Sequence, residues 1–210
     1  HAPGLRGLSV MRTCVLHVGM AKTGSTSIQA TLAALPPSPD FVLLQSGEAN
    51  AARALSAAFM LRPERFRPNR KRGHDAAALK RKGAKALKTF DEQLEAGASL
   101  AVLSSEMLPG FDVDTLGAMR DWLQARFDRI RVLAYVREPV AYMESMVQQS
   151  LKNGNHDLDL ERRYPSYREH FANLEAVFGA DALEYRLFDA RHLLRGCVVQ
   201  DFASAIGLPL

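Results

Sequence analysis

The chain has 210 residues and a formal net charge of +4, with 47% hydrophobic and 24% charged residues. This length and composition suit one globular domain and exclude a disordered, collagen-like or coiled-coil chain. No stretch approaches the roughly 18 consecutive apolar residues of a transmembrane helix, and the N-terminal residues lack the apolar core of a secretory signal, so we expect a single cytoplasmic domain over residues 1–210.

Short apolar, β-branched runs alternate with segments of helical composition from one end of the chain to the other. Strands are predicted at 13–18, 41–44, 100–104, 130–136 and 183–188. Helices are predicted at 25–35, 48–60, 75–96, 115–127, 140–152, 166–178 and 193–206. This alternation predicts an α/β fold, a three-layer sandwich with a central parallel sheet. The carboxyl ends of the strands then share one edge of the sheet, where ligands bind in such folds.

A strongly basic run interrupts this pattern, and we interpret residues 62–90 as a basic insertion. Residues 62–88 hold 11 Lys or Arg against only Glu64 and Asp75, a net charge of +9. Such a run either attracts an anionic ligand or forms a solvated helical face. It has few aromatic neighbours and matches no recognition motif for nucleic acid, so we expect no nucleic-acid partner.

Two cysteines, Cys14 and Cys197, lie far apart in the sequence and outside any Cys/His cluster. This spacing predicts neither a disulfide framework nor a metal site. We expect both to behave as small apolar residues in a reducing compartment.

The sequence GMAKTGST at 19–26 joins the first predicted strand directly to a helix. Backbone N–H groups of a tight turn and of the first helical turn converge on one spot, and the helix dipole adds partial positive charge there. A lysine and three hydroxyl side chains fall within the same eight residues. This P-loop-like turn therefore predicts a phosphate-binding site, with an ordinary strand-to-helix turn as the alternative. The expected ligands are Lys22, Thr23, Gly24, Ser25 and Thr26.

The spacing of this loop departs from the ATPase pattern G-x-x-x-x-G-K-[ST]. Lys22 precedes Gly24 by two residues, and Ser25 stands where the ATPase pattern has lysine. No predicted strand ends in a clear aspartate for magnesium. A small-molecule kinase using ATP and Mg²⁺ remains an alternative, as does a nucleotide-binding module without catalysis.

Residues 22–26 resemble the 5′-phosphosulfate loop of the sulfotransferases that use 3′-phosphoadenosine 5′-phosphosulfate (PAPS), usually written P-K-[ST]-G-[ST]-[ST]. Ala21 stands where that family usually has proline. The second family signature is a strand that ends in arginine, with a serine eight residues later, and residues 137–139 (Arg-Glu-Pro) and Ser145 match it. The resemblance is to members of bacterial type. It implies that Arg137 and Ser145 bind the 3′-phosphate, with adenosine 3′,5′-bisphosphate as the product.

The resemblance implies in-line transfer of a sulfuryl group to a hydroxyl or amine of an acceptor. By analogy with phosphoryl transfer, Lys22 is expected to stabilise the leaving oxygen. A base must accept the proton of the acceptor, and Glu106, His17 and Glu138 are the candidates. We favour Glu106, with a capping or ion-paired carboxylate as the alternative, whereas His17 in an apolar strand is more typical of a core histidine.

The acceptor is not identified by the sequence. A small molecule, a glycan or a lipid fits the resemblance, and the basic run favours an anionic one. The regions 36–98 and 153–170 lie outside the nucleotide motifs and are expected to shape its pocket. His74 is a further candidate for the base that accepts the proton, if the basic segment folds over the site. The sequence does not indicate an oligomeric state.

Overall fold

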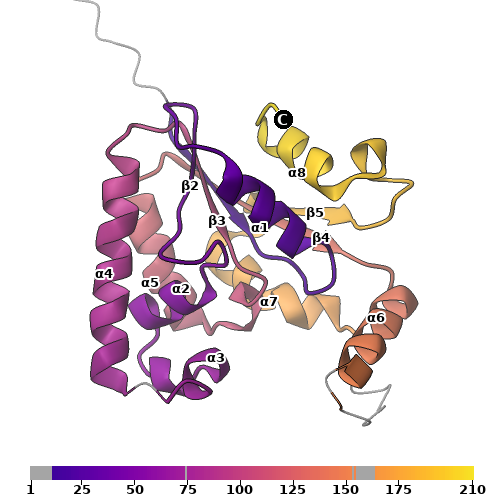
Figure 1. Ribbon diagram of the computed structural model, residues 1–210, viewed down its shortest axis with the longest axis horizontal. Helices are drawn as coiled ribbons and strands as arrows, with labels where there is room; N and C mark the ends of the chain where they lie inside the picture. The colour runs from indigo at the N-terminus through magenta and orange to yellow at the C-terminus, as the bar shows by residue number, and fades with distance from the viewer. Residues whose placement is uncertain (1–10, 74, 153, 155–163) are drawn as a thin grey trace, which may run out of the picture.

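Five parallel strands form the central sheet in the computed structural model, which describes residues 11–73, 75–152, 154 and 164–210 (Figure 1). The strands are β1 (Thr13–His17), β2 (Phe41–Leu43), β3 (Leu100–Ser104), β4 (Arg129–Val136) and β5 (Leu183–Leu187). Their order in the sheet is β2-β3-β1-β4-β5. From β1 the chain passes to β2 at one edge of the sheet and returns to β3, beside β1. It then crosses to the other side of β1, where β4 and β5 lie. In such a sheet the crevice for a ligand opens at the carboxyl end of this switch point.

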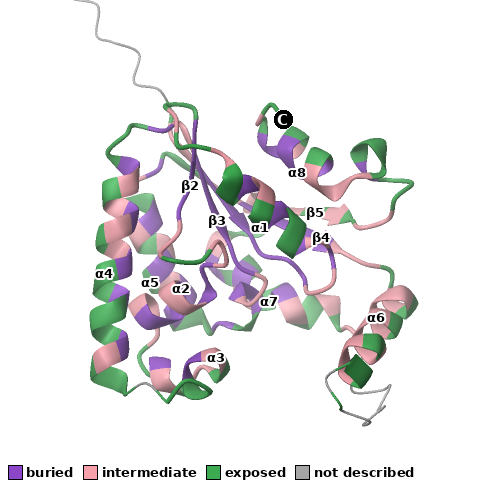
Figure 2. Ribbon diagram, viewed as in Figure 1, coloured by how far each residue is buried: buried purple, intermediate pink, exposed green. Residues whose placement is uncertain are grey.

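Helices cover both faces of the sheet because successive strand residues point to opposite sides. Val15, Val102 and Leu133 face one side, where α1 (Ser25–Ala34) and α8 (Val198–Ile206) pack. The strand residues between these, such as Cys14 and Leu16, face the other side. The helices packed there are α2 (Ala52–Phe59), α4 (Ala76–Leu94), α5 (Val113–Gln124) and α7 (Tyr167–Phe178). Figure 2 shows the buried residues along the strands and on the inner sides of these helices. The predicted three-layer α/β fold with a parallel sheet is therefore confirmed.

One helix stands apart from both layers. Helix α6 (Pro139–Lys152) follows β4 directly and has no buried residue (Figure 2). It projects from the carboxyl edge of the sheet, beside the loop that leads into α1 (Figure 1). This position makes α6 one wall of the region where ligands are expected.

The basic segment folds as a short 3₁₀ turn (Pro63–Arg65), α3 (Arg67–Arg70) and the long helix α4. Asp75 begins α4 by accepting a hydrogen bond from the backbone N–H of Ala78 at 2.6 Å, as N-cap residues do. Gly83 in α4 lets this helix lie directly on α2, since a Cβ at this position would come within 2.3 Å of the Ala57 carbonyl oxygen. Within the described residues, no helix combines the length and the apolar surface of a membrane span.

Two helices begin later than the sequence pattern predicted. Helix α2 begins at Ala52 rather than at residue 48, because Asn50 accepts a hydrogen bond from the backbone N–H of Ala52 and forms a turn there. Helix α8 begins at Val198 rather than at residue 193. Arg195 and Gly196 both have positive φ, 53° and 69°, and this backbone conformation interrupts the helix.

Candidate functional site

The loop after β1 is fixed by hydrogen bonds that continue the pairing of β1 with β4. The backbone N–H of Met20 donates to the Tyr135 carbonyl at 2.9 Å, and the N–H of Tyr135 donates to the Gly19 carbonyl at 2.6 Å. On its other side the loop touches the end of β3. A Cβ on Gly19, which has φ +86°, would lie 2.8 Å from the Cβ of Glu106. Glycine at position 19 therefore lets the loop and Glu106 come into direct contact.

The backbone of this loop presents a row of free donors at the start of α1. Gly24 is the N-cap residue in the left-handed conformation, with φ 78° and ψ 13°, and Lys22 also has a positive φ of 68°. Among the described residues, no acceptor takes a hydrogen bond from the backbone N–H groups of residues 22–26. Unpaired N–H groups at a helix N-terminus attract an anion. The loop thus presents unpaired backbone N–H groups at the N-terminus of α1.

The predicted hydroxyl groups divide between two positions. Thr23 and Ser25 are buried, and both hydroxyls donate to the Met20 carbonyl, Thr23 at 2.6 Å and Ser25 at 3.5 Å. Thr26 is exposed at the start of α1. Thr23 and Ser25 therefore stabilise the shape of the loop, whereas the side chain of Thr26 faces solvent.

Arg137 and Lys22 are brought together across the two strand ends. The Nη1 group of Arg137 donates to the Lys22 carbonyl at 3.2 Å, and its guanidinium lies 5.7 Å from the centre of the Phe188 ring. The hydroxyl of Tyr167 donates to the Arg137 carbonyl. Two cationic side chains with fixed backbones thus lie at one edge of the sheet, although they are 115 residues apart in sequence.

Helix α6 contributes a polar row that includes the predicted Ser145. The Nζ group of Lys22 donates to the Oε1 atom of Gln149 at 3.1 Å. Ser145 is half-buried and precedes Gln149 by four residues, so both side chains lie on one side of the helix. Tyr142 lies on the same side. Sequence reasoning missed Gln149 and Tyr142, and the helical spacing from Ser145 is the signal that points to them.

Glu106 lies in the electrostatic field of this site. Burial raises the pKa of its carboxyl, and the positive charge of Lys22 partly offsets this rise. Burial also raises the pKa of Tyr142, and the negative charge of Glu106 adds to that effect. A carboxylate with a raised pKa beside a cationic group has the chemistry of a proton acceptor.

The other two candidate bases lie in different surroundings. Glu138 is an exposed side chain that accepts hydrogen bonds from the backbone N–H groups of Val140 and Ala141, and these bonds lower its pKa. It caps the start of α6. His17 is fully buried under the strand ends, and desolvation lowers its pKa to about 4. Its Nδ1 atom lies 2.8 Å from the Ser104 hydroxyl, which places it in the core. His74 lies outside the described residues.

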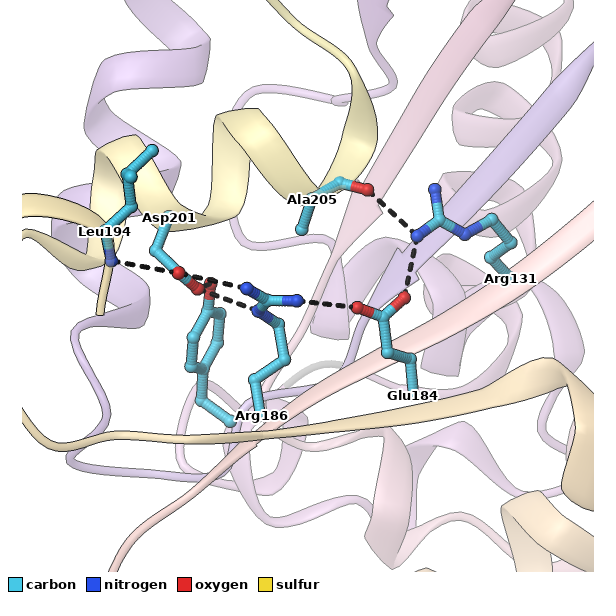
Figure 3. Close-up of polar contacts among 7 residues, drawn as sticks. Arg131, Glu184, Arg186, Leu194, Asp201 and Ala205 are labelled. Atoms are coloured by element: carbon cyan, nitrogen blue, oxygen red, sulfur yellow. Dashed lines mark hydrogen bonds and ion pairs between the residues drawn. The ribbon is translucent and has the colours of Figure 1, made fainter. Parts of the chain in front are cut away.

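A network of ionic groups holds the C-terminal helix against β4 and β5 (Figure 3). The buried Asp201 carboxylate pairs with both Nε and Nη2 of Arg186 and accepts a hydrogen bond from the Tyr135 hydroxyl at 2.6 Å. Glu184 joins Arg186 to Arg131 at 2.9 and 2.7 Å. Asp201 also accepts a hydrogen bond from the backbone N–H of Leu194, so the network ties the turn before α8 to the helix itself.

The start of α8 in turn supports the phosphate-binding loop. A Cβ on Gly24 would lie 2.7 Å from Cγ1 of Val198 and 3.3 Å from the Phe188 ring. The loop is therefore enclosed by β3, by α6 and by the C-terminal segment. Among the described residues, no group of three His, Cys, Asp or Glu side chains could hold a metal ion.

Comparison with solved structures identifies proteins of similar architecture. A sulfotransferase from Alicyclobacillus acidocaldarius matches 95% of this chain and 83% of its own length, with a TM-score of 0.59 and 20% sequence identity. The sulfotransferase domain from the Synechococcus PCC 7002 olefin synthase matches 97% of this chain and 76% of its own, with a TM-score of 0.51 and 20% identity. No family model and no curated protein matches the sequence. The chain therefore has the α/β fold of the bacterial sulfotransferases.

Proposed function

We propose that this protein is a sulfotransferase that moves a sulfuryl group from PAPS to a hydroxyl or amine of an acceptor. The observation that carries the proposal is the meeting of Lys22, the free N–H groups of residues 22–26 and Arg137 at the carboxyl ends of β1 and β4. This arrangement offers two separate anion-binding points, as a nucleotide with phosphates at both its 5′ and 3′ positions requires. The similarity in fold supports the same reaction class.

The loop and Lys22 have the role of holding the 5′-phosphosulfate. In the proposed reaction the bond between sulfur and the bridging phosphate oxygen breaks, and a bond from sulfur to the acceptor oxygen or nitrogen forms. The departing oxygen carries the developing negative charge, which the Lys22 ammonium and the N-terminus of α1 stabilise. Adenosine 3′,5′-bisphosphate is the leaving group.

Glu106 has the role of the base that takes the proton from the attacking group. Its contact with Gly19 places it beside the loop that would hold the sulfuryl group. Its raised pKa increases the basicity of the carboxylate, and the charge of Lys22 favours the ionised form that can accept a proton. Arg137 and Ser145 have the role of binding the 3′-phosphate, with the ring of Phe188 against the Arg137 guanidinium.

Thermal unfolding with adenosine 3′,5′-bisphosphate tests the donor site. A ligand at 100 times its dissociation constant stabilises the folded state by about 2.7 kcal/mol, which raises Tm by roughly 5–10 °C for a chain of this size. Adenosine 5′-monophosphate, which lacks the 3′-phosphate, is expected to give a much smaller shift.

The matched variants are Arg137→Ala and Arg129→Ala, which remove arginines from opposite ends of β4. Arg129 is exposed and lies far from the carboxyl edge of the sheet. The proposal requires that Arg137→Ala abolish the difference between the two nucleotides and that Arg129→Ala preserve it. Equal shifts for both nucleotides in the unsubstituted protein would refute the assignment of a 3′-phosphate site.

A further inference from the structure

The basic segment presents its positive charge to solvent. Each of the 11 Lys and Arg residues between positions 62 and 88 is exposed, and they extend over the 3₁₀ turn, α3 and α4. Figure 1 places α4 on the far side of α2 from α6, with α3 below α2 in this view. A net charge of +9 over so short a segment produces a strong local positive potential.

This surface is hollowed where α2, α3 and α4 meet. One hollow of about 510 Å³ is lined by four cationic residues, Arg53, Arg72, Lys82 and Lys85, and by small or polar side chains that include Ala57 and Thr89. A second hollow of about 350 Å³ shares Arg53 and Arg72 with the first and adds Lys71. Because these two arginines line both hollows, the hollows lie side by side, and we call the two together the basic groove.

Most of the cationic charge in the basic groove is not neutralised by neighbouring carboxylates. Arg53 pairs with Glu48. Within the described part of the chain, Lys71, Arg72 and Lys85 form no ion pair. Like charges gathered in one concave site repel one another, so an anionic ligand that lies between these cations relieves their repulsion.

The basic groove begins next to the candidate proton acceptor in the chain. Met107 lines the second hollow, and it directly follows Glu106. Glu106 itself lies against Gly19 of the phosphate-binding loop. The segment after β3 therefore has one residue against the loop and the next residue in the lining of the groove.

We propose that the basic groove binds the acceptor and that the acceptor is an acidic oligosaccharide. This inference rests on the proposed function, which requires a hydroxyl or amine at the reacting end. The groove adds a requirement for repeated negative charge along the rest of the molecule. A chain of sugars that carries carboxylate or sulfate groups satisfies both requirements, with its hydroxyls bonded by polar side chains such as Ser46 and Thr89.

The lining of the groove disfavours other anionic ligands. No aromatic side chain is among its lining residues, so bases of a single-stranded nucleic acid would find no stacking surface. The apolar residues in the first hollow are alanines and the buried Leu79, which offer little surface to a lipid chain. A concave groove also suits a thin chain better than the flat surface of a folded protein.

The test is binding of a fluorescein-labelled oligogalacturonate, a chain of uronic acids, measured by fluorescence anisotropy on the full chain at low ionic strength. The groove variant carries Lys71→Gln, Arg72→Gln and Lys85→Gln, which are exposed positions where loss of folding is not expected. The control variant carries three substitutions that remove the same amount of charge from a third hollow, which lies outside the basic groove. These are Arg62→Gln, Arg65→Gln and Arg67→Gln.

The proposal predicts that the groove variant weakens binding by about tenfold or more, whereas the control variant weakens it less than about threefold. An uncharged maltooligosaccharide is expected not to compete. Equal losses in both triple variants, or no binding of the oligogalacturonate, would overturn the proposal. Binding of polyglutamate with the same affinity would also overturn it, since the groove would then accept any acidic chain.

The same variants separate this inference from the proposed function. The groove variant is expected to keep the full Tm shift with adenosine 3′,5′-bisphosphate, because its substitutions lie outside the phosphate-binding loop. If the bisphosphate binds and the oligogalacturonate does not, the donor site stands and the acceptor assignment fails. If the bisphosphate itself does not bind, the proposed function fails first.

Discussion

The proposed role of Glu106 requires an ionised carboxylate, and this ionised carboxylate lowers the stability of the folded protein. Its carboxyl pKa is raised by burial, so the folded state binds this proton more tightly than the unfolded state does. The resulting stabilisation is present below the ordinary pKa of glutamate and is lost as pH rises through the folded value. At neutral pH the ionised Glu106 therefore destabilises the fold, in exchange for a side chain that can accept a proton.

The substitution Glu106→Gln is accordingly expected to raise Tm at neutral pH and to abolish sulfuryl transfer. The gain in Tm should shrink as pH falls below about 4, where Glu106 is neutral in both states. Thermal unfolding across pH measures this. Glu144→Gln, which changes an exposed carboxylate on α6, is the control and should leave Tm nearly unchanged. A lower Tm for Glu106→Gln at neutral pH would show that the carboxylate has a stabilising partner instead.

Asp201 has the opposite character, because its charge is needed by the fold. Burial acts to raise the pKa of this carboxyl, but hydrogen bonds from Arg186 and Tyr135 outweigh it and lower the pKa. Its contribution to stability is thus present above the ordinary pKa of aspartate and is lost as pH falls through the folded value.

We expect Asp201→Asn to destabilise the protein by about 2 kcal/mol, or roughly 4–8 °C in Tm. The difference from the unsubstituted protein should narrow in acid. Asp189→Asn is the control, because its carboxylate pairs with the exposed Arg191 outside the buried network. Equal effects of the two substitutions would mean that the network of Figure 3 does not anchor α8.

At the scale of the elements, the contact between the phosphate-binding loop and α8 leads to a prediction for stability and for nucleotide binding. Gly24 and Gly207 have similar left-handed backbones, with φ of 78° and 74°. A Cβ on Gly24 would meet Val198 at 2.7 Å, whereas a Cβ on Gly207 would meet nothing within 4 Å. The pair therefore separates the effect of backbone strain from the effect of packing.

Gly207→Ala is expected to cost about 1 kcal/mol from backbone strain alone. Gly24→Ala should cost about 1–3 kcal/mol more, because α8 or the loop must shift, and it should also weaken binding of the bisphosphate. Adding Val198→Ala should restore part of the affinity. Chemical denaturation and nucleotide titration of these three variants and of the unsubstituted protein measure the changes in stability and in affinity. No recovery in the double variant would mean that Val198 does not limit the position of the loop.

At the scale of the whole molecule, the sheet could be predicted because each of its strands has a recognisable local sequence pattern. Short apolar runs that end at Gly19 and Arg137 predict buried parallel strands and their carboxyl ends, whichever neighbours they acquire. The predicted meeting of Lys22 and Arg137 follows from this topology. Local pattern and the rules for parallel sheets thus place the loop and Arg137 at one edge, whereas the proposed role of Arg137 and Ser145 as a 3′-phosphate site comes from the family resemblance.

The remaining parts of the site depend on contacts that no local pattern encodes. Tyr135 and Asp201 are 66 residues apart, and Lys22 and Gln149 are 127 apart. Asp201, Lys22 and Gln149 are each of a residue type that is typical of surface positions, so the local sequence does not indicate their partners. The basic groove is a similar case, since the charge of residues 62–88 was visible in the sequence. Its concave shape depends on the close approach of α2 and α4 at Gly83.

The central claim is that the carboxyl edge of this sheet binds a nucleotide with a 3′-phosphate. Isothermal titration calorimetry of the full chain with adenosine 3′,5′-bisphosphate, and separately with ATP and Mg²⁺, tests it most directly. The account predicts one site per chain for the bisphosphate, with an affinity that does not depend on Mg²⁺, and much weaker binding of ATP. Binding of ATP only in the presence of Mg²⁺, with none of the bisphosphate, would contradict it and indicate a kinase.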